Sequence, residues 1–126
     1  MKTSELTGAA LDWAVAKAGN ITVIEDFSLK YYPLLIIPGE EELVSDTYRG
    51  FAPSSIWAQG GPIIEREKIF LVQPYRSRAF CKAYKMEPDT ELPCWLNDGP
   101  TPLIAAMRCY VANKLGDEVE IPEELV

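Results

Sequence analysis

The sequence predicts an α+β fold, with about three helices packed on a small antiparallel sheet in an α-β-α, sandwich-like order. Helical spacing of apolar residues recurs in three separate segments, and short β-branched runs lie between them. The chain has 126 residues, of which 48% are hydrophobic, as is usual for one domain with its own core. We therefore expect residues 1–126 to form a single domain, because no linker or internal repeat divides them.

The N-terminal segment predicts a helix over residues 4–18. Leu6 and Trp13 fall on one helical stripe, and Gly19-Asn20 supplies a stop signal. We expect this helix to bury both of these large side chains and to use its alanines for close contact with the element that it covers.

Residues 20–53 predict less regular structure. The short β-branched run at residues 21–24 predicts a strand, and the apolar run at residues 31–37 predicts another. Pro33 makes this second strand an edge strand or marks the start of a strand, because proline has no amide hydrogen to donate to a central ladder. We expect residues 39–53 to form an exposed loop.

Residues 55–67 predict a second helix with a weak point at its glycines. Pro62 follows Gly60-Gly61, and it either kinks this helix or stands at the start of a shorter one over residues 63–67. We favour the longer helix.

Residues 69–73 and 78–85 predict two antiparallel strands joined by a turn at residues 74–77. Alternation divides the second strand into two faces. The first face carries the small residues Ala79, Cys81 and Ala83, and the second carries Arg78, Phe80, Lys82 and Tyr84. We expect a helix to lie closest to the small face.

The C-terminal helix has the clearest signals. After a proline-containing loop at residues 87–98, Thr101 is expected to cap a helix over residues 102–115, with a proline in its first turn and Gly116 at its end. Residues 117–126 then form an acidic tail that has five carboxylates and no positive charge.

The composition excludes several kinds of chemistry. The chain has no histidine, which removes the commonest general base and the commonest metal ligand. Its three cysteines are widely spaced and lack a Cys-x-x-Cys pair, so they predict reduced packing residues rather than disulfides or a zinc site. We expect no metal and no cofactor, and any catalysis would have to rely on carboxylates, Lys, Tyr or a borrowed cofactor.

The sequence predicts a cytoplasmic protein that does not engage a membrane. Glu5, Asp12 and Lys17 interrupt the N-terminal apolar residues, so that no apolar core of a secretory signal remains. The longest apolar run, at residues 31–38, is far too short to span a bilayer.

The net charge of −7 is unevenly distributed. Residues 1–61 carry a net charge of −4 and residues 87–126 carry −7, whereas residues 62–86 carry +4. An acidic chain is a poor non-specific binder of nucleic acid, because neutralising phosphates requires concentrated Lys and Arg. The charge pattern still allows a local basic face in the middle of the chain.

Four segments of the chain form a recognisable series. They are Leu6–Ala16, Trp57–Arg66, Gly99–Ala112 and Lys114–Val119. In this order they resemble the NinX-like family of lambdoid phages and prophages. The resemblance implies an accessory phage protein that acts in a bacterial host and is encoded near replication and recombination genes. It implies no reaction, and it transfers no catalytic or ligand-binding residue to this chain.

Two glycine-proline segments are candidate anion sites. Gly60-Gly61-Pro62 and Gly99-Pro100-Thr101 each precede or enter a predicted helix, whose free amides and dipole can hold a phosphate or a carboxylate. The alternative is plain capping and turn chemistry, because proline removes one of those donors.

One face of strand 78–85 is a candidate surface for single-stranded nucleic acid. It places Arg78 and Lys82 beside Phe80 and Tyr84, and such combinations stack bases and contact phosphates. In the alternative, which we favour, the aromatic rings pack under a helix while the cations extend into solvent.

The second helix carries four candidates for a pocket, namely Trp57, Gln59, Glu65 and Arg66. Glu65 would be the acid or base of such a pocket. In the alternative, Trp57 is a core anchor, and Glu65 and Arg66 form an exposed pair. A carboxylate without a recognisable partner gives little support for an enzyme. Arg108 on the C-terminal helix completes the candidate binding residues.

The acidic tail and Glu40–Glu42 suggest an interaction protein that engages a basic surface of a host or phage protein. The alternative is a solvated tail that only adds solubility. We favour protein interaction over catalysis, and the sequence specifies neither the partner nor the oligomeric state.

Overall fold

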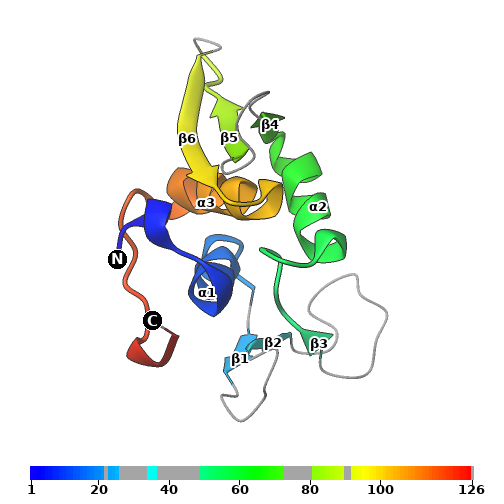
Figure 1. Cartoon of the computed structure of the whole chain (residues 1–126), viewed down its shortest axis with the longest axis vertical. Helices are drawn as coiled ribbons and strands as arrows, with labels where there is room; N and C mark the ends of the chain where they lie inside the picture. The colour runs from blue at the N-terminus through cyan, green and yellow to red at the C-terminus, as the bar shows by residue number, and fades with distance from the viewer. Residues whose placement is uncertain (22, 26–33, 37–48, 73–80, 90–91, 126) are drawn as a thin grey trace.

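A computed structural model describes residues 1–21, 23–25, 34–36, 49–72, 81–89 and 92–125 (Figure 1). In chain order the elements are η1 (Thr3–Glu5), α1 (Gly8–Ala18), β1 (Val23–Glu25), β2 (Leu34–Ile36), β3 (Arg49–Gly50), α2 (Trp57–Glu67), β4 (Phe70–Val72), β5 (Cys81–Met86), β6 (Pro93–Gly99), α3 (Pro102–Leu115) and η2 (Glu123–Leu125). The α-helices and antiparallel strands confirm the predicted α+β class.

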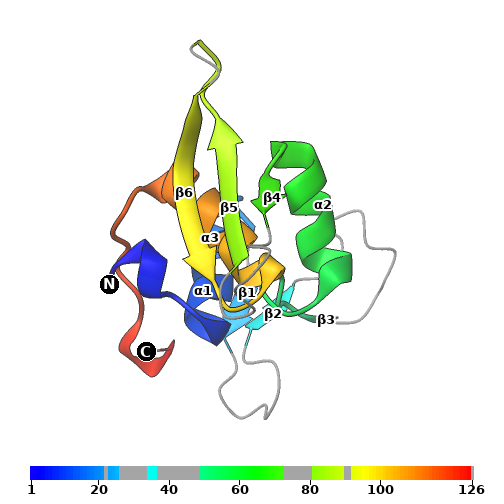
Figure 2. The same cartoon turned by 45° about the horizontal axis from the view of Figure 1, so that its top comes forward.

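The strands form two small antiparallel sheets, in the orders β1-β2-β3 and β4-β5-β6. Helix α3 packs on β5 and β6, and both α1 and α2 pack on α3. Figures 1 and 2 show α3 against one face of the β4-β5-β6 sheet, with α1 on the far side of α3. The β1-β2-β3 sheet lies beyond α1, at the end of the molecule opposite the β5-β6 turn (Figure 1).

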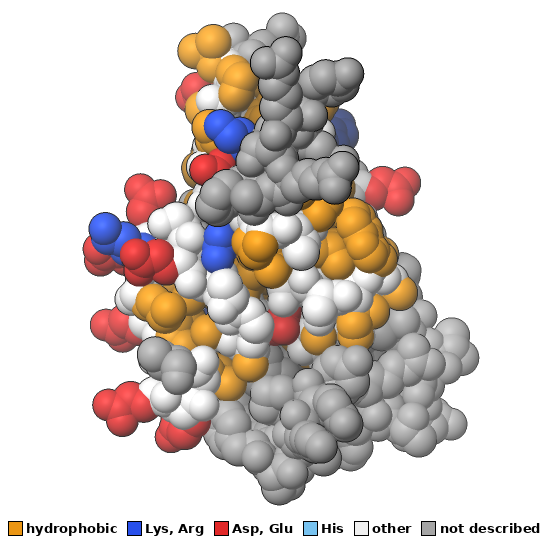
Figure 3. Space-filling model, viewed as in Figure 1, with side chains coloured by type: hydrophobic (Ala, Val, Ile, Leu, Met, Phe, Trp, Pro, Cys, Tyr) orange, Lys and Arg blue, Asp and Glu red, His pale blue; other side chains and the backbone are white. Residues whose placement is uncertain are grey.

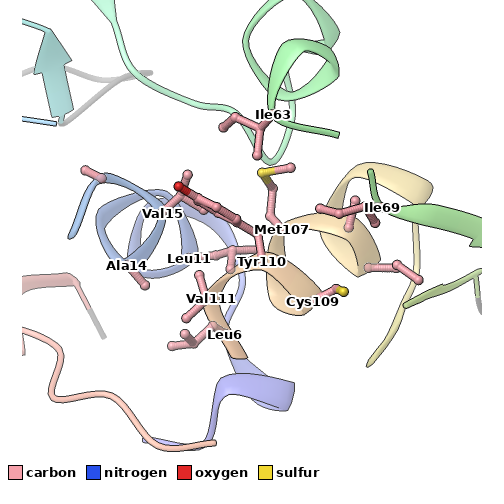
Figure 4. Packing of buried hydrophobic residues seen from close by; sticks show 14 of the residues in the cluster. Leu6, Leu11, Ala14, Val15, Ile63, Ile69, Met107, Cys109, Tyr110 and Val111 are labelled. Atoms are coloured by element: carbon pink, nitrogen blue, oxygen red, sulfur yellow. The ribbon is translucent and has the colours of Figure 1, made fainter. Parts of the chain in front are cut away.

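Helix α3 is the centre of the fold, and its predicted bounds are confirmed. Thr101 is the N-cap, because its Oγ1 accepts a hydrogen bond from the amide of Ile104 at 3.1 Å. Every residue from Ala105 to Ala112 is buried, so the helix is surrounded by protein rather than packed along one stripe. Figure 4 shows Met107 and Tyr110 of α3 among the side chains of α1 and α2.

Helix α1 begins at Gly8, so the predicted start at residue 4 is wrong. The side chain of Thr3 donates a hydrogen bond to the carbonyl oxygen of Gly116 at 2.7 Å, and its amide donates to the carbonyl of Asp117 at 2.8 Å. These contacts hold Thr3 in a short 3-10 turn, away from the helix. Leu6 is buried as predicted, whereas Trp13 is only partly buried against the core.

Helix α2 runs without interruption from Trp57 to Glu67, with Pro62 inside it. The longer of the two predicted helices is therefore correct, and the shorter one is wrong. The exposed fraction of Trp57 is 55%, so this residue is not the core anchor that the alternative required.

The predicted exposed loop over residues 39–53 is wrong at its C-terminal end. Arg49-Gly50 forms β3, and Phe51, Ala52 and Pro53 are buried. Residues 39–48 lie outside the described part of the chain. The burial arises because this segment runs under the first turns of α2, which local sequence signals do not reveal.

The predicted loop over residues 87–98 is also wrong in part, because residues 93–99 form β6. Two features hide this strand in the sequence. Pro93 stands at its first position, where a missing amide is tolerated, and a bulge at Trp95 interrupts the alternation of its side chains.

The predicted pair of strands at residues 69–73 and 78–85 is confirmed where it is described, as β4 and β5 in antiparallel register. Ala83 is fully buried and Lys82 is exposed, so the small face does lie against α3. The turn at residues 74–77 and the residues 78–80 lie outside the described part.

The acidic C-terminal residues are held against the N-terminus. The ammonium of Met1 donates to the carbonyl of Val119 at 3.0 Å, and the amide of Val119 donates back to Met1 at 2.9 Å. Val119 and Ile121 pack against the core, while the acidic side chains of residues 117–124 are exposed. Figure 3 shows acidic side chains along the side of the molecule where both chain ends lie.

Candidate functional site

The face of the β4-β5-β6 sheet that points away from α3 is rich in exposed apolar side chains. Alternation along the strands and the cross-strand register place eight residues on it, of which Pro93 lies opposite Met86 beside the β5-β6 turn. We call the other seven the sheet surface, and they are Phe70, Val72, Lys82, Tyr84, Met86, Leu96 and Asp98. Among the described residues, nine large hydrophobic side chains are exposed, and six of them belong to this sheet or its β5-β6 turn. The exposed apolar area is therefore concentrated here.

Two cross-strand pairs define the centre of the sheet surface. Phe70 lies opposite Tyr84, with ring centroids 5.1 Å apart and ring planes within 9° of parallel. Lys82 lies opposite Asp98 on the neighbouring strand. The first pair makes an aromatic platform, and the second pair leaves the surface without net charge.

A β-bulge places Leu96 on the sheet surface. The register changes between the pairs Ala83–Asn97 and Lys85–Cys94, so β6 has one extra residue opposite Tyr84. Trp95 takes up the extra residue with φ of 53° and packs against the core. Leu96 consequently faces the other way, with an exposed fraction of 56%.

Lys82 is the candidate binding residue that the structure places on this surface. Tyr84 shares the surface and stacks on Phe70, while α3 lies on the opposite face of the sheet. In the described part of the chain no helix covers the ring, contrary to the interpretation favoured from the sequence. Arg78 and Phe80 lie outside the described residues.

Gln59 has a structural role rather than a place in a pocket. Its Nε2 donates to the carbonyl oxygen of Gly50, and its Oε1 accepts from the amide of Ala52, both at 2.7 Å. The side chain therefore fastens α2 to the segment that leads into it.

Gly60 and Gly99 are explained by close packing. A Cβ atom on Gly60 would collide with the carbonyl of Pro53 and lie 2.6 Å from Cδ2 of Leu103, and one on Gly99 would lie 2.7 Å from the amide nitrogen of Ala105. Gly61 is different, because nothing lies within 4 Å of the position of its Cβ. Close packing therefore requires a glycine at two of these three positions.

The remaining α2 candidates do not form a pocket. Trp57 and Glu65 are both exposed, but two helical turns separate them, a rise of about 12 Å. Arg66 is exposed and pairs with Glu67, with 3.4 Å between its Nε and Oε2. The exposed pair proposed for Glu65 and Arg66 is therefore an exposed ion pair between Arg66 and Glu67.

Neither glycine-proline segment presents a free group of amides to an anion. The amide of Gly60 already donates to the carbonyl of Ile56 at 2.9 Å, because this segment lies inside α2. At the start of α3, the Thr101 hydroxyl occupies the amide of Ile104. Capping and packing account for both segments.

Arg108 is buried and ties three parts of the chain together. Its Nε donates to the carbonyl of Leu6 at 2.8 Å, and its Nη1 donates to the carbonyl of Asp98 at 2.7 Å. Burial lowers the pKa of this guanidinium, and the nearby charge of Asp98 opposes that effect. Its donors face the protein, so Arg108 stabilises the fold rather than a ligand.

A cluster that sequence reasoning missed joins β5, α2 and α3. The Nζ atoms of Lys85 and Lys114 lie 3.3 and 3.2 Å from Oε1 of Glu67, and Lys85 also donates to Asn113 at 2.9 Å. Burial would raise the pKa of Glu67, but the hydrogen bonds and charges of the two lysines outweigh it and lower the pKa. The partners lie 18 to 47 positions from Glu67 in the sequence, so no local motif marks this cluster.

A second missed feature is the buried carboxylate of Asp12. Its Oδ1 accepts a hydrogen bond from the amide of Ser54 at 2.9 Å, which links α1 to the segment before α2. Burial raises the pKa of Asp12 to about 6, although the hydroxyl and amide of Ser54 act in the opposite direction. Asp12 had been read only as a charge that interrupts an apolar segment.

The cysteines are free thiols in the structure. Burial raises the pKa of Cys109 to about 12, so this thiol is unreactive at neutral pH.

Within the described ranges, no helix is long and apolar enough to cross a membrane, and no three potential metal ligands of the Cys, Asp or Glu type gather in one place.

These features define a small α+β protein whose described residues pack on one face of its larger sheet and leave the other face open. Residues 2–114 match the family model described as bacteriophage P22, NinX, and the chain belongs to this family. The match confirms the family predicted from the four sequence blocks, and it identifies the chain as a phage accessory protein. A search of curated proteins gives no match.

Proposed function

We propose that this phage accessory protein is a non-catalytic binding protein, which acts in the host cytoplasm by engaging a protein through the sheet surface. The observation that carries the proposal is the exposure of Phe70, Val72 and Leu96, at 48%, 43% and 56%, on one continuous sheet face. Soluble proteins rarely expose contiguous apolar patches of this kind unless the patch binds something.

The chemistry of the sheet surface favours a protein partner. Most of its side chains are apolar or aromatic, as in the centre of protein interfaces. Among its described residues the one cation, Lys82, faces an anion, Asp98, so phosphate groups find little net attraction to this part of the surface. The net charge of the whole chain, −7, opposes binding to nucleic acid as well.

The acidic side chains of residues 117–124 support the proposal in a secondary way. They project from a segment that is fastened to the N-terminus, and they form a separate acidic surface that can attract a basic protein. Truncation is a poor test of this role because it would also remove the contacts of Val119 with Met1 and of Asp117 with the amide of Thr3. Charge reversal at Glu120, Glu123 and Glu124 keeps those contacts.

Affinity capture of the tagged full-length chain from infected host cells tests the proposal. Leu96→Asp places a charge at the centre of the sheet surface, and we expect it to reduce the captured partner at least about tenfold. Trp57→Asp is the matched control, because it adds the same charge at an equally exposed residue on α2. If Leu96→Asp keeps the partner that wild type captures, the sheet surface is not the binding site.

Single-stranded nucleic acid is the second candidate, and the stacked pair of Phe70 and Tyr84 beside Lys82 supports it. Fluorescence anisotropy with a labelled oligonucleotide at low salt distinguishes the two candidates. Binding that falls with Tyr84→Ala and with Lys82→Glu would favour nucleic acid over protein. Wild type that fails to bind the oligonucleotide would remove this candidate.

A further inference from the structure

We propose that the partner that fits the sheet surface is a second copy of this chain, so that two sheets pack face to face around a two-fold axis. The inference rests on the proposed function, because it names the partner of the same surface. It follows from the shape, the charge and the size of that surface.

The shape of the sheet surface suits another sheet. Three strands present a gently twisted face, with side chains from alternate positions standing on it. Two such faces pack about 10 Å apart with their strands nearly aligned. In the dimer, each β4-β5-β6 sheet is covered by its own α3 on one face and by the second sheet on the other, which buries both faces.

The charges of the sheet surface are self-complementary. A two-fold interface brings the same patch of both copies together, so it needs apolar groups opposite apolar groups and each charge opposite its counterpart. The surface carries one cation and one anion side by side, and Lys82 of one copy can face Asp98 of the other. A strongly basic or acidic partner would match a surface with net charge, and the seven described residues of this surface carry none.

The rest of the chain restricts where two copies can meet. With a net charge of −7, two copies repel each other over most of their surfaces. Most of the exposed acidic side chains in the described part of the chain lie on residues 117–124, and the others are Glu5, Glu65, Asp89 and, on the sheet surface, Asp98. A neutral apolar face is therefore the place where contact costs the least electrostatic energy.

The size of the surface predicts a reversible dimer. Three strands spaced about 4.8 Å apart and up to seven residues long cover about 14 Å by 24 Å. This lies below the area of a standard interface, about 800 Å² per partner. We therefore expect a dissociation constant on the order of 10 to 100 µM, which corresponds to about 5 to 7 kcal/mol.

Sedimentation velocity of the full-length chain, from about 5 µM to about 500 µM, tests the inference. The mass of wild type should rise from 14.1 kDa toward twice that value across the range. Leu96→Asp should stay monomeric throughout. Lys82→Glu should weaken association about tenfold, because it sets an acid against Asp98 of the other copy. Trp57→Asp should behave as wild type, and circular dichroism should show that every variant is folded.

Wild type that remains monomeric at the highest concentration would overturn the dimer. So would a dimer that survives Leu96→Asp, because its interface would lie elsewhere. Either result overturns the dimer alone and does not decide the proposed function. That function would still be supported if the capture experiment returned a different protein that wild type and Trp57→Asp bind and Leu96→Asp does not. The failures of the two proposals are thus distinguishable.

Discussion

The two faces of the β4-β5-β6 sheet differ more than any other pair of regions in the protein. On the inner face, Ala83 is fully buried, and Gly99 lies so close to Ala105 of α3 that a methyl group would not fit. On the outer face, Leu96 and Phe70 are about half exposed. The same strands therefore contribute tight packing to the fold on one side and an unpacked apolar surface on the other.

The family match covers both faces of the sheet, because it extends over residues 2–114, but the four blocks that resemble the family do not. The blocks include Gly99–Ala112, which supplies α3 and its contact with the inner face. None of the seven residues of the sheet surface lies within any of the four blocks. The blocks therefore explain the fold, and the residues that we propose to bind lie outside them.

The largest effect is expected at the contact between the sheet and α3. Gly99→Ala would place a methyl group 2.7 Å from the amide nitrogen of Ala105 and 3.1 Å from its Cα, both backbone atoms that cannot move aside easily. We expect a loss of about 3 to 4 kcal/mol in the free energy of unfolding, measured by urea denaturation. A loss below about 1 kcal/mol would show that the inner face is looser than the structure indicates.

A slightly smaller effect is expected from Arg108→Met, because it leaves the carbonyl oxygens of Leu6 and Asp98 without their donor. We expect a loss of about 3 kcal/mol in the free energy of unfolding. Arg66→Met is the matched control, since the Arg66 side chain is 58% exposed and its ion pair should contribute less than about 0.5 kcal/mol. Equal losses for the two variants would contradict a structural role for Arg108.

Asp12 predicts a pH dependence of stability. The pKa of this acid is about 6 in the folded protein against a model value of 3.8, so its contribution is most favourable below about pH 4 and is lost as the pH rises through 6. Two pH units correspond to about 3 kcal/mol. Asn at this position can keep the hydrogen bond from the Ser54 amide without ionising.

We therefore expect the difference in the free energy of unfolding between Asp12→Asn and wild type to grow in favour of the variant as the pH rises from 4 to 7.5, by up to about 3 kcal/mol. Urea titrations of both proteins at pH 4 and at pH 7.5 measure this change. The other carboxylates, including Glu67, titrate in both proteins, so their contribution to the pH dependence of stability cancels in the difference between variant and wild type. A difference that does not change with pH would mean that the Asp12 carboxyl is better solvated than its burial implies.

Sequence reasoning succeeded where local signals determine structure. Thr101 and the proline after it are sufficient to start α3, and the same kind of local signal gave α2 nearly its full length. Sequence reasoning failed where contacts between residues far apart in the sequence determine the structure. The first helix begins at Gly8 rather than residue 4 because Thr3 bonds to Gly116, 113 positions away, and holds the segment before the helix in a 3-10 turn. The sequence does not predict β6 because a proline and a bulge mask its period.

The same failure concealed the candidate site. Because the sequence does not predict β6, it gives no sheet face on which to place Leu96 and no opposite charge beside Lys82. The expectation that a helix would cover Tyr84 also assumed helices on both sides of the sheet. In the described part of the chain α3 lies on one face with α1 behind it, and α2 lies beside β4 at the edge of the sheet (Figure 2). The site therefore depends on tertiary arrangement, which alternation in a single strand does not contain.

The two adjacent glycines of α2 provide a smaller test of the same contrast. Gly61 has open space around it, so Gly61→Ala should stabilise the protein by about 1 kcal/mol, the usual gain for alanine in a helix. Gly60→Ala is the control and should destabilise, because its methyl group would meet Pro53 and Leu103. A rise in melting temperature for the second variant, or a fall for the first, would contradict the packing described around α2.

The smallest effect is expected on the sheet surface itself. Leu96→Ser removes an apolar side chain that the described residues leave 56% exposed, so it should change the free energy of unfolding by no more than about 0.5 kcal/mol. Ala83→Ser, on the buried face of the neighbouring strand, should cost more, since it places a hydroxyl where no water reaches. A loss of about 2 kcal/mol or more at Leu96 would mean that the monomer itself covers this face, because only a buried side chain costs that much. The surface would then belong to the core, and neither a protein partner nor a second copy would have access to it.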